Sequence, residues 1–234
     1  MFFTGNGLAE KGCMREKRKK KIRPVKTRRV SFPSDEKVIS WLPLLMDAYF
    51  IVEKGVAGAI ESEQGKGRRL ACHKGCSYCC SLSDIPVYPL ELMGLSWYAA
   101  EKIIGSPRET LIRQLYSHHR NDPCPFLING ECSIHLMRPM ACRQFNVFQK
   151  LCSEGEDPYY TRPEDLLPPV KRHVDQAFFI MLPFHGVEKE SERIRAVESG
   201  AMHRFVKNMP ECNWKMLAER MQDFDLKKTT GKVQ

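Results

Sequence analysis

The sequence predicts a mostly α fold: a compact helical domain with one small β-hairpin and irregular loops that carry cysteines. Apolar residues recur at helical spacing in six segments, which is the main sign of amphipathic helices. Strand-forming residues flank the pair Asn129-Gly130, which favours a tight hairpin turn. Hydrophobic residues make up 42% of the 234 residues, enough for a real core.

The first two helices are expected around Pro43 and Pro89. The segment from Pro43 to Ile60 keeps one face apolar, and proline suits a first helical turn. Residues 61–69 are rich in glycine and charge and should end this helix. A second helix should follow Pro89, with Leu92, Leu95, Ala99 and Ile103 on one face.

The remaining elements follow from capping and periodicity. Ser106-Pro107-Arg108-Glu109 predicts a capping box that opens a helix through Leu111, Leu115 and Tyr116. Apolar periodicities predict three more helices, and the hairpin should pair 126–128 with 131–134. The three helices are expected at Val170–Met181, Ile194–Val206 and Trp214–Met221.

The charge of the chain is concentrated at its beginning. Residues 1–30 hold eleven Lys or Arg and two acids, a net of +9 that equals the net charge of the whole chain. We therefore expect a basic, disordered arm at 1–33, a cysteine-cluster metal-binding domain at 34–223 with its motif core at 70–152, and a flexible tail at 224–234. The arm is either a solvated tail, or an extension upstream of a later start such as Met14. Alternatively, residues 11–29 bind nucleic acid or another polyanion.

The sequence favours a cytoplasmic protein without a membrane span. No apolar stretch follows the start as a secretory signal would require. The stretch Val38–Val52 is interrupted by Asp47, and Gln176–Val187 is shorter than the ~20 residues that cross a bilayer. Because cytoplasmic thiols stay reduced, clustered cysteines there indicate metal binding or redox chemistry rather than disulfides.

Eight of the ten cysteines lie between residues 72 and 152, and this clustering is the strongest signal in the sequence. Eight thiolates would suit two four-coordinate sites, holding either two zinc ions or iron as iron–sulfur clusters. Cys13 and Cys212 lie outside the cluster and are expected to be incidental. The candidate metal ligands are Cys72, Cys76, Cys79, Cys80, Cys124, Cys132, Cys142 and Cys152.

Local structure suggests how three of these cysteines lie. In a two-residue hairpin, Cys132 would face Leu127 and Cys124 would face His135, which puts the two thiols on opposite faces. Neighbouring prolines can interrupt that register. Pro139 should open a short helix with Cys142 in its first turn. The helix dipole and the flanking arginines, Arg138 and Arg143, should favour the thiolate there.

These motifs resemble a known family. The pattern Cys72-x3-Cys76-x2-Cys79-Cys80, followed by Cys124-Pro-Phe-Leu, Gly130-x-Cys132-Ser-Ile-His135 and Arg138-Pro139-x2-Cys142-Arg143, resembles the bacterial YkgJ-type cysteine-cluster proteins. The resemblance covers roughly residues 70–152 and implies zinc or iron chelation. This sequence has three residues between its first two cysteines, where the family usually has two. It also has His135 at a position that is aromatic in the family, so a nitrogen ligand is an alternative there.

The leading hypothesis is a cytoplasmic metal-chelating protein that binds zinc or iron through the eight cysteines. An enzyme is the second hypothesis, either an iron–sulfur oxidoreductase or a protein-modifying enzyme. A related cysteine pattern occurs in flagellin lysine methylases, and family members often carry an acid after the double cysteine, where Glu91 lies here. Cys72, Cys76 and Cys79 also have the spacing of radical S-adenosylmethionine enzymes, but no series of strands follows them. A polyanion-binding module that uses residues 11–29 is the third hypothesis.

Overall fold

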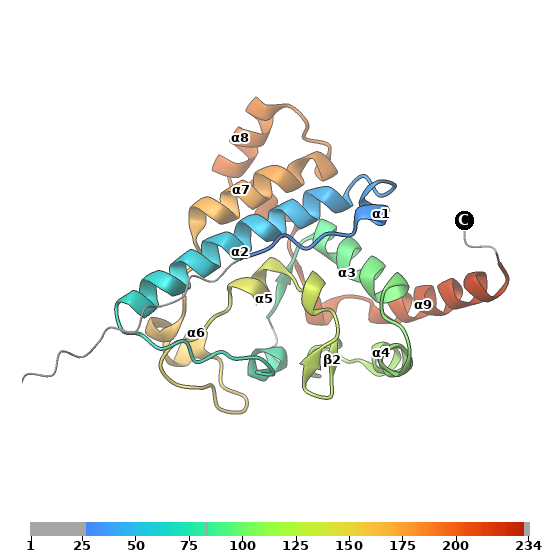
Figure 1. Cartoon of the computed structure of the whole chain (residues 1–234), viewed down its shortest axis with the longest axis horizontal. Helices are drawn as coiled ribbons and strands as arrows, with labels where there is room; N and C mark the ends of the chain where they lie inside the picture. Colours follow the sequence, from blue (N-terminus) through green and yellow to red (C-terminus); the bar gives the residue numbers. More distant parts are fainter. Residues whose placement is uncertain (1–26, 83, 232–234) are drawn as a thin grey trace, which may run out of the picture.

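The computed structural model describes residues 27–82 and 84–231, and most of these lie in helices (Figure 1). The prediction of a mostly α fold is confirmed. The α-helices are α1 (Pro33–Glu36), α2 (Leu42–Gly65), α3 (Pro89–Glu101), α4 (Ser106–Ser117), α5 (Met140–Gln144), α6 (Pro158–Thr161), α7 (Lys171–Met181), α8 (Glu190–Glu198) and α9 (Trp214–Thr229).

Two helix pairs organise the fold. The long helix α2 packs along α7 and also contacts α5, while α9 packs against both α3 and α4 (Figure 1). Contacts between α2 and α3 join the two pairs. The irregular segments that carry the cysteines lie around α5 and the β2–β3 hairpin, on the side of α2 away from α8 (Figure 1). The helices therefore form a scaffold beside the cysteine-bearing loops.

The helices predicted at Pro43 and Pro89 are present, and both prolines lie in a first turn. Helix α2 continues to Gly65, five residues past its expected end at Ile60. In this extension, Glu63 pairs with Lys66 at 2.6 Å and with Arg68 at 2.8 Å, just past the end of the helix. The predicted helix at 170–181 is present as α7, and the one at 214–221 is present as α9, which extends to Thr229.

The capping box predicted at Ser106 is wrong. The residue before α4 is Gly105, with φ 69°, and no side chain caps this helix. Arg108, the third residue of the predicted box, is buried instead. Its guanidinium donates to the backbone oxygens of Ala99, Ala100 and Ile103 at 2.8–3.2 Å, and so satisfies carbonyls at the end of α3.

The single helix predicted over Ile194–Val206 is also wrong. Helix α8 ends at Glu198, and a 3-10 helix, η5 (Ala201–Phe205), follows it. Gly200 between them has φ 68°, a left-handed conformation that glycine adopts without steric cost and that ends a helix. The apolar residues keep their helical spacing across this break, so the periodicity of the sequence does not reveal it.

The predicted hairpin forms, but its ladder is short. Strand β2 (Leu127–Ile128) pairs antiparallel with β3 (Glu131–Cys132), and Leu127 lies opposite Cys132 as expected. A second two-stranded sheet, not predicted, pairs β1 (Pro86–Val87) with β4 (Lys207–Asn208). The other 3-10 helices are η1 (Tyr78–Ser81), η2 (His135–Met137), η3 (Pro163–Asp165), η4 (Leu182–His185) and η6 (Met209–Glu211).

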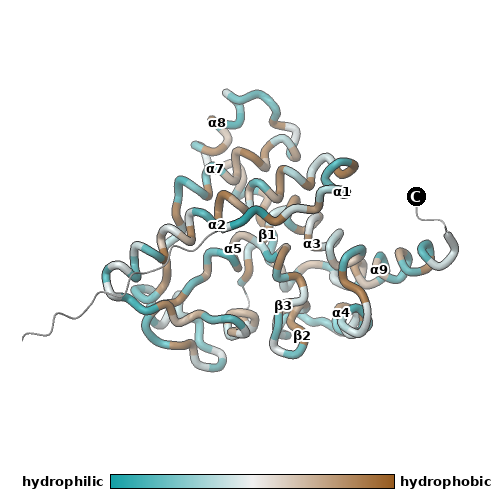
Figure 2. The backbone as a smooth tube through the Cα atoms, viewed as in Figure 1, coloured by the Kyte–Doolittle hydropathy of each residue, from teal (hydrophilic) through white to brown (hydrophobic). Residues whose placement is uncertain are grey.

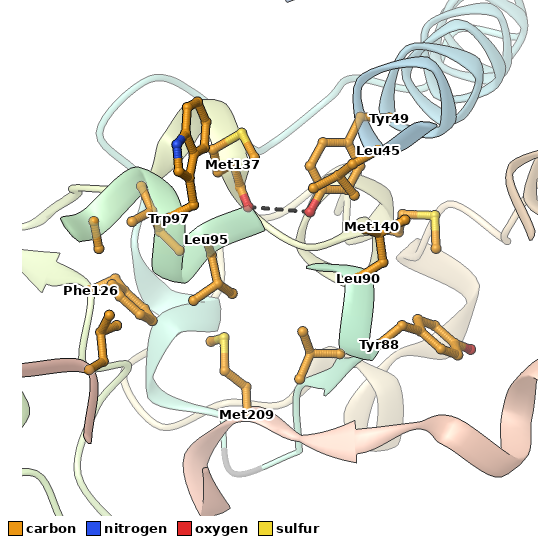
Figure 3. Packing of buried hydrophobic residues seen from close by; sticks show 14 of the residues in the cluster. Leu45, Tyr49, Tyr88, Leu90, Leu95, Trp97, Phe126, Met137, Met140 and Met209 are labelled. Carbon is orange, nitrogen blue, oxygen red and sulfur yellow. Dashed lines mark hydrogen bonds between the residues drawn. The ribbon is translucent and has the colours of Figure 1, made fainter. Parts of the chain in front are cut away.

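One hydrophobic core joins the helices to the cysteine-bearing segments (Figure 3). Leu45 and Tyr49 of α2 meet Met137 and Met140 there, and the Tyr49 hydroxyl donates to the Met137 oxygen at 3.4 Å. In Figure 2 the hydrophobic stretches of the tube concentrate toward this centre, whereas α8 is mostly hydrophilic. Burial at the core therefore holds the chain around residues 137–140 in place from the α2 side.

The expected arm at 1–33 lies mostly outside the described residues. Its last part is structured: Arg29 pairs with Glu36 at 2.9 Å and with Asp47 at 2.6 Å, and α1 begins at Pro33. The expected tail boundary at 224 falls inside α9. The division into arm, domain and tail stays a prediction. Within residues 27–82 and 84–231, no helix is both long and apolar enough to cross a membrane.

Candidate metal centre

Four cysteines from four separate segments lie near one another, and we call them the inner group: Cys79, Cys124, Cys132 and Cys142. Cys79 is in η1, Cys132 is in β3 and Cys142 is in α5. Cys124 precedes the hairpin, and its backbone N–H donates to the Cys80 oxygen at 2.6 Å. This bond joins the first cysteine motif to the second across more than forty residues of sequence.

The electrostatics of the inner group show that its members are mutual neighbours. Burial raises the pKa of the Cys124 thiol to about 12, with further contributions from Cys142, Cys132 and Cys79. Burial also raises the pKa of Cys142 to about 12, with contributions from Cys79 and Cys132, and it raises the pKa of Cys132 with a contribution from Cys79. Each pair among the four thiols is thus coupled. Charge repulsion of this kind is what a bound cation relieves.

Two expectations about these thiols are corrected. Cys124 and Cys132 do not lie on opposite faces of a long hairpin, because the ladder covers only residues 127–128 and 131–132. His135, the expected partner of Cys124, begins η2 instead. The position of Cys142 in the first turn of α5 is confirmed, but its thiolate is not favoured in the metal-free protein. Burial outweighs the opposing effect of Arg138 and raises the pKa.

Glu91 is a buried carboxylate, 0% exposed, that fixes the segment carrying Cys142. It accepts hydrogen bonds from the Tyr88 N–H at 3.0 Å and from the Met140 N–H at 2.7 Å. These two N–H groups lie at the starts of α3 and α5, so one side chain satisfies both helix N-termini. Glu91 is therefore an acid in the first turn of α3, and its hydrogen bonds extend to the start of a second helix.

Arg143 stabilises the conformation of the loop before α5. Its side chain is 2% exposed, pairs with Glu53, and donates to the Arg138 oxygen at 2.8 Å and the Leu136 oxygen at 2.6 Å. Its guanidinium also lies over the Tyr49 ring, 3.9 Å from the centroid. Arg138 and Arg143 both lower the pKa of Cys132. Their charges would stabilise thiolate ligands in the inner group.

Three further cysteines form a second set, which we call the outer group: Cys72, Cys76 and Cys152. Residues 69–72 run beside 147–149, with an isolated bridge between Leu70 and Phe148 and a hydrogen bond from the Ala71 N–H to the Val147 oxygen at 2.8 Å. Cys76 follows in a turn, and its own backbone N–H donates to the His73 oxygen at 3.1 Å. This pairing brings the beginning and the end of the cysteine motif together.

The thiols of the outer group are also coupled to one another. Burial raises the pKa of Cys72, and neighbouring Cys76 and Cys79 contribute. Burial likewise raises the pKa of Cys152, with contributions from Cys72 and Cys76. Cys79 of the inner group is thus within electrostatic reach of the outer group, and the two sets of thiols are neighbours.

Two hydrogen-bond donors point at sulfur in the outer group. The Val147 N–H lies 3.3 Å from the Cys72 Sγ, and the Arg162 Nη2 lies 3.6 Å from the Cys152 Sγ. Arg162 is held in place by Glu156 at 2.7 Å, by Asp165 at 2.9 Å and by the Lys150 oxygen at 2.8 Å. Donors to sulfur stabilise thiolate, the form that binds metal.

The remaining cysteines and histidines lie elsewhere. Cys80 hydrogen-bonds to the Cys79 thiol and packs against the hydrophobic core, so it lies on the inner side. Cys212 packs against the core near α9, and Cys13 is outside the described residues. The His135 Nδ1 lies 2.9 Å from the Arg138 Nη1, and the exposed His73 ring bonds to the Lys74 oxygen. Within residues 27–82 and 84–231, no three His, Cys, Asp or Glu side chains already surround a point where a metal ion could sit.

Sequence reasoning missed Arg162 and the bridging role of Glu91. Arg162 is ten residues from Cys152, in a segment without periodicity, so no spacing rule connects them. Glu91 stands among Pro89, Leu90, Leu92 and Met93. A lone acid in an apolar first turn was the available signal for a buried cap.

The comparison with known families agrees with this geometry. Residues 71–164 match the model of the CxxCxxCC family, which is described as a "putative zinc- or iron-chelating domain". No curated protein and no solved structure matches the chain. The matched segment holds all eight clustered cysteines together with Glu91, Arg143 and Arg162. Over residues 71–164, the chain is therefore similar to the CxxCxxCC family.

Proposed function

We propose that this protein binds zinc or iron through eight cysteine thiolates, those of the inner and outer groups together with Cys80. The observation that carries the proposal is the inner group, in which four thiols from distant segments are all coupled to one another. Four thiolates are the ligand set of structural zinc sites and of iron–sulfur clusters. The description of the family supports the same chemistry.

We infer that the protein works in a reducing compartment such as the cytoplasm, because its clustered cysteines must stay reduced to bind metal. Reduced thiols are available for metal only where disulfides do not form. We therefore place the metal-loaded protein in such a compartment.

Metal analysis of protein purified without oxygen tests this function. We expect at least one equivalent of zinc or iron per chain and two when both groups are loaded. A visible absorption band would identify iron, because zinc is d¹⁰ and colourless. Less than about half an equivalent of any transition metal, in folded protein with intact thiols, would contradict the proposal.

Matched variants locate the metal in the inner group. Cys132→Ser removes one inner thiolate and should release the metal that this group holds. Cys212→Ser removes a thiol that lies outside both groups and should leave the metal content unchanged. Equal metal content in the two variants would exclude the inner group as the site.

A further inference from the structure

We propose that residues 69–72 form an open sheet edge, to which an extended, acidic segment of a partner protein adds as a further strand. This inference is independent of the proposed metal binding, because it depends on the backbone and on surface charges and not on any thiol. The partner is defined by its chemistry: a strand-forming segment in which apolar and acidic side chains alternate. Strand addition of this kind takes its affinity from main-chain hydrogen bonds and its specificity from side chains.

Three short extended segments lie side by side in this part of the molecule. An isolated antiparallel bridge pairs Leu70 with Phe148, and a second one pairs Val147 with Leu166. Phe148 and Val147 therefore belong to the middle strand of a small sheet, and Leu70 and Leu166 belong to its two neighbours. Among the described residues, the strand that holds Leu70 is paired on one side only.

The unpaired side of this strand presents the backbone of Leu70. On the paired side, the Ala71 N–H donates to the Val147 oxygen at 2.8 Å. The Arg69 oxygen accepts from the Gln149 N–H at 2.7 Å. Because the backbone groups of an extended chain alternate in direction, the N–H and the oxygen of Leu70 point the other way, and no described residue hydrogen-bonds to either group. One residue of an added antiparallel strand can exchange both hydrogen bonds with Leu70.

A surface hollow of about 280 Å³ lies beside this edge. Leucine and alanine supply half of its lining residues, and the other half are polar or basic. The lining residues come from both paired segments and are Arg69, Leu70, Ala71, His73, Gln149 and Leu151. The hollow therefore accepts an apolar side chain of the added strand, with polar and basic groups at its border.

The charges around the edge favour an acidic partner. Residues 66–74 hold four Lys or Arg and no acid, and two of these cations pair with Glu63. Arg69, Lys74 and the nearby Lys150 are exposed and form no ion pair within the described part of the chain. These like charges repel the same edge of a second copy, which is how edge strands are commonly protected from self-association. Acidic side chains of a partner are attracted instead.

Fluorescence anisotropy with a synthetic peptide tests the added strand. The probe is the dye-labelled, amidated hexapeptide Thr-Val-Glu-Val-Glu-Val, and the protein is the reduced, full-length chain. The same peptide with Lys in place of Glu should bind at least about tenfold more weakly, because like charges then meet across the edge. Raising the sodium chloride concentration from about 0.05 M to about 0.5 M should weaken binding of the Glu peptide several-fold.

Variants locate the peptide on this edge. Leu70→Pro removes the outward N–H, which an edge strand tolerates, and should weaken binding about 2- to 12-fold, the usual contribution of one hydrogen bond. Lys74→Gln/Lys150→Gln should weaken it about 2- to 10-fold. Lys215→Gln/Lys227→Gln makes the same change of charge on α9, at the opposite side of the molecule in Figure 1, and should leave the affinity unchanged.

Backbone methylation of the peptide leaves the protein intact and does not depend on the folding of any variant. An N-methyl group is placed on each peptide residue in turn, so that one N–H is removed at a time. In an added strand every second N–H faces the sheet, so methylation should weaken binding at alternate positions and not at the residues between them.

Three outcomes would overturn the inference. Equal effects of methylation at all positions would show that the peptide does not bind as a strand. An affinity that neither Leu70→Pro nor Lys74→Gln/Lys150→Gln lowers would place the peptide elsewhere, such as on the basic residues 1–30. No binding of the Glu peptide at millimolar concentration would exclude an acidic strand, and binding of a labelled oligodeoxythymidylate in that case would assign the cations to nucleic acid.

Discussion

At the scale of single residues, Glu91 shows how one buried carboxyl can link two helices to a cysteine site. Its two oxygens accept from the N–H groups of Tyr88 and Met140. Burial nevertheless dominates, and it raises the pKa of Glu91 to about 7 from the ordinary value of 4.5. The carboxyl is therefore protonated in the folded protein over a pH range in which it is ionised in the unfolded chain.

This shift predicts a pH-dependent stability. Because the folded state binds the proton more tightly, stability from this group is fully present below pH 4.5 and is lost as the pH rises through 7. Glu91→Gln cannot titrate. Between pH 4.5 and 7, the metal-free parent protein should lose on the order of 3 kcal/mol of unfolding free energy relative to Glu91→Gln.

Urea unfolding of reduced, metal-free protein at several pH values measures this loss. Glu219→Gln, which changes an exposed carboxyl on α9, is the matched control and should run parallel to the parent. Parallel curves for Glu91→Gln and the parent would show that Glu91 does not titrate in this range.

At the scale of elements, the contact between α2 and α7 depends on a glycine. A Cβ placed on Gly55 would lie 2.6 Å from the Cγ of His173 and 2.8 Å from its Cβ, closer than packed atoms approach. A Cβ placed on Gly58, about one turn further along α2, would meet no neighbouring atom within 4 Å. The two glycines thus form a natural pair in the same helix.

Alanine at these two positions should have opposite effects. Gly55→Ala should lower the free energy of unfolding by about 1–3 kcal/mol, because α7 must shift away from α2. Gly58→Ala should raise it by about 0.4–1 kcal/mol, because it reduces the flexibility of the unfolded chain. Urea unfolding at fixed pH compares both with the parent protein, and a loss of similar size in both variants would contradict this account of the helix contact.

What the sequence could predict depends on how local each feature is. The hairpin was predictable because Asn129-Gly130 sets its turn, and the helix starts because Pro43 and Pro89 mark first turns. The pairing of β1 with β4 was not predictable, because two-residue strands about 120 residues apart leave no periodicity. Gly200 could have indicated the break after α8 through its left-handed preference, but the apolar spacing masked it.

The same distinction between local and long-range features applies to the candidate site. Spacing alone identified the eight cysteines as a cluster, because 81 consecutive residues hold all of them. Their assignment to an inner and an outer group depends on contacts between segments far apart in sequence, such as Cys124 with Cys80. Two consecutive residues, Cys79 and Cys80, gave no sign that both belong with the later cysteines.

At the scale of the whole molecule, metal in the inner group would cross-link four segments of the fold. Binding to the folded state alone raises stability by mass action, about 2.7 kcal/mol when the free metal is a hundred times its dissociation constant. Zinc-loaded protein should therefore melt at a higher temperature than protein treated with a chelator. In calorimetry, the melting-temperature difference between zinc-loaded and chelator-treated protein should be smaller for Cys132→Ser than for Cys212→Ser. Equal melting temperatures of the parent protein with and without chelator would argue against metal binding by the folded state.

The beginning of the chain should be separable from the fold. Deletion of residues 1–26 keeps Arg29 and its pairs with Glu36 and Asp47, so it should leave the melting temperature unchanged. In the full chain, Arg29→Gln should lower the free energy of unfolding by about 0.5–1 kcal/mol, the usual size for partly exposed ion pairs. Thermal unfolding measures both variants. A large decrease in the melting temperature of the deletion variant would show that residues 1–26 stabilise the fold.

The packing of α9 on α3 and α4 bears on when the protein can receive its metal. Helices α3 and α4 separate Cys79 from Cys124 in sequence, and both rest on α9, which is synthesised after all eight clustered cysteines. The scaffold around the inner group is therefore complete only once α9 has folded onto it. We expect the inner group to bind metal only at that stage, and a chain truncated before Trp214 to leave its cysteines exposed to oxidation.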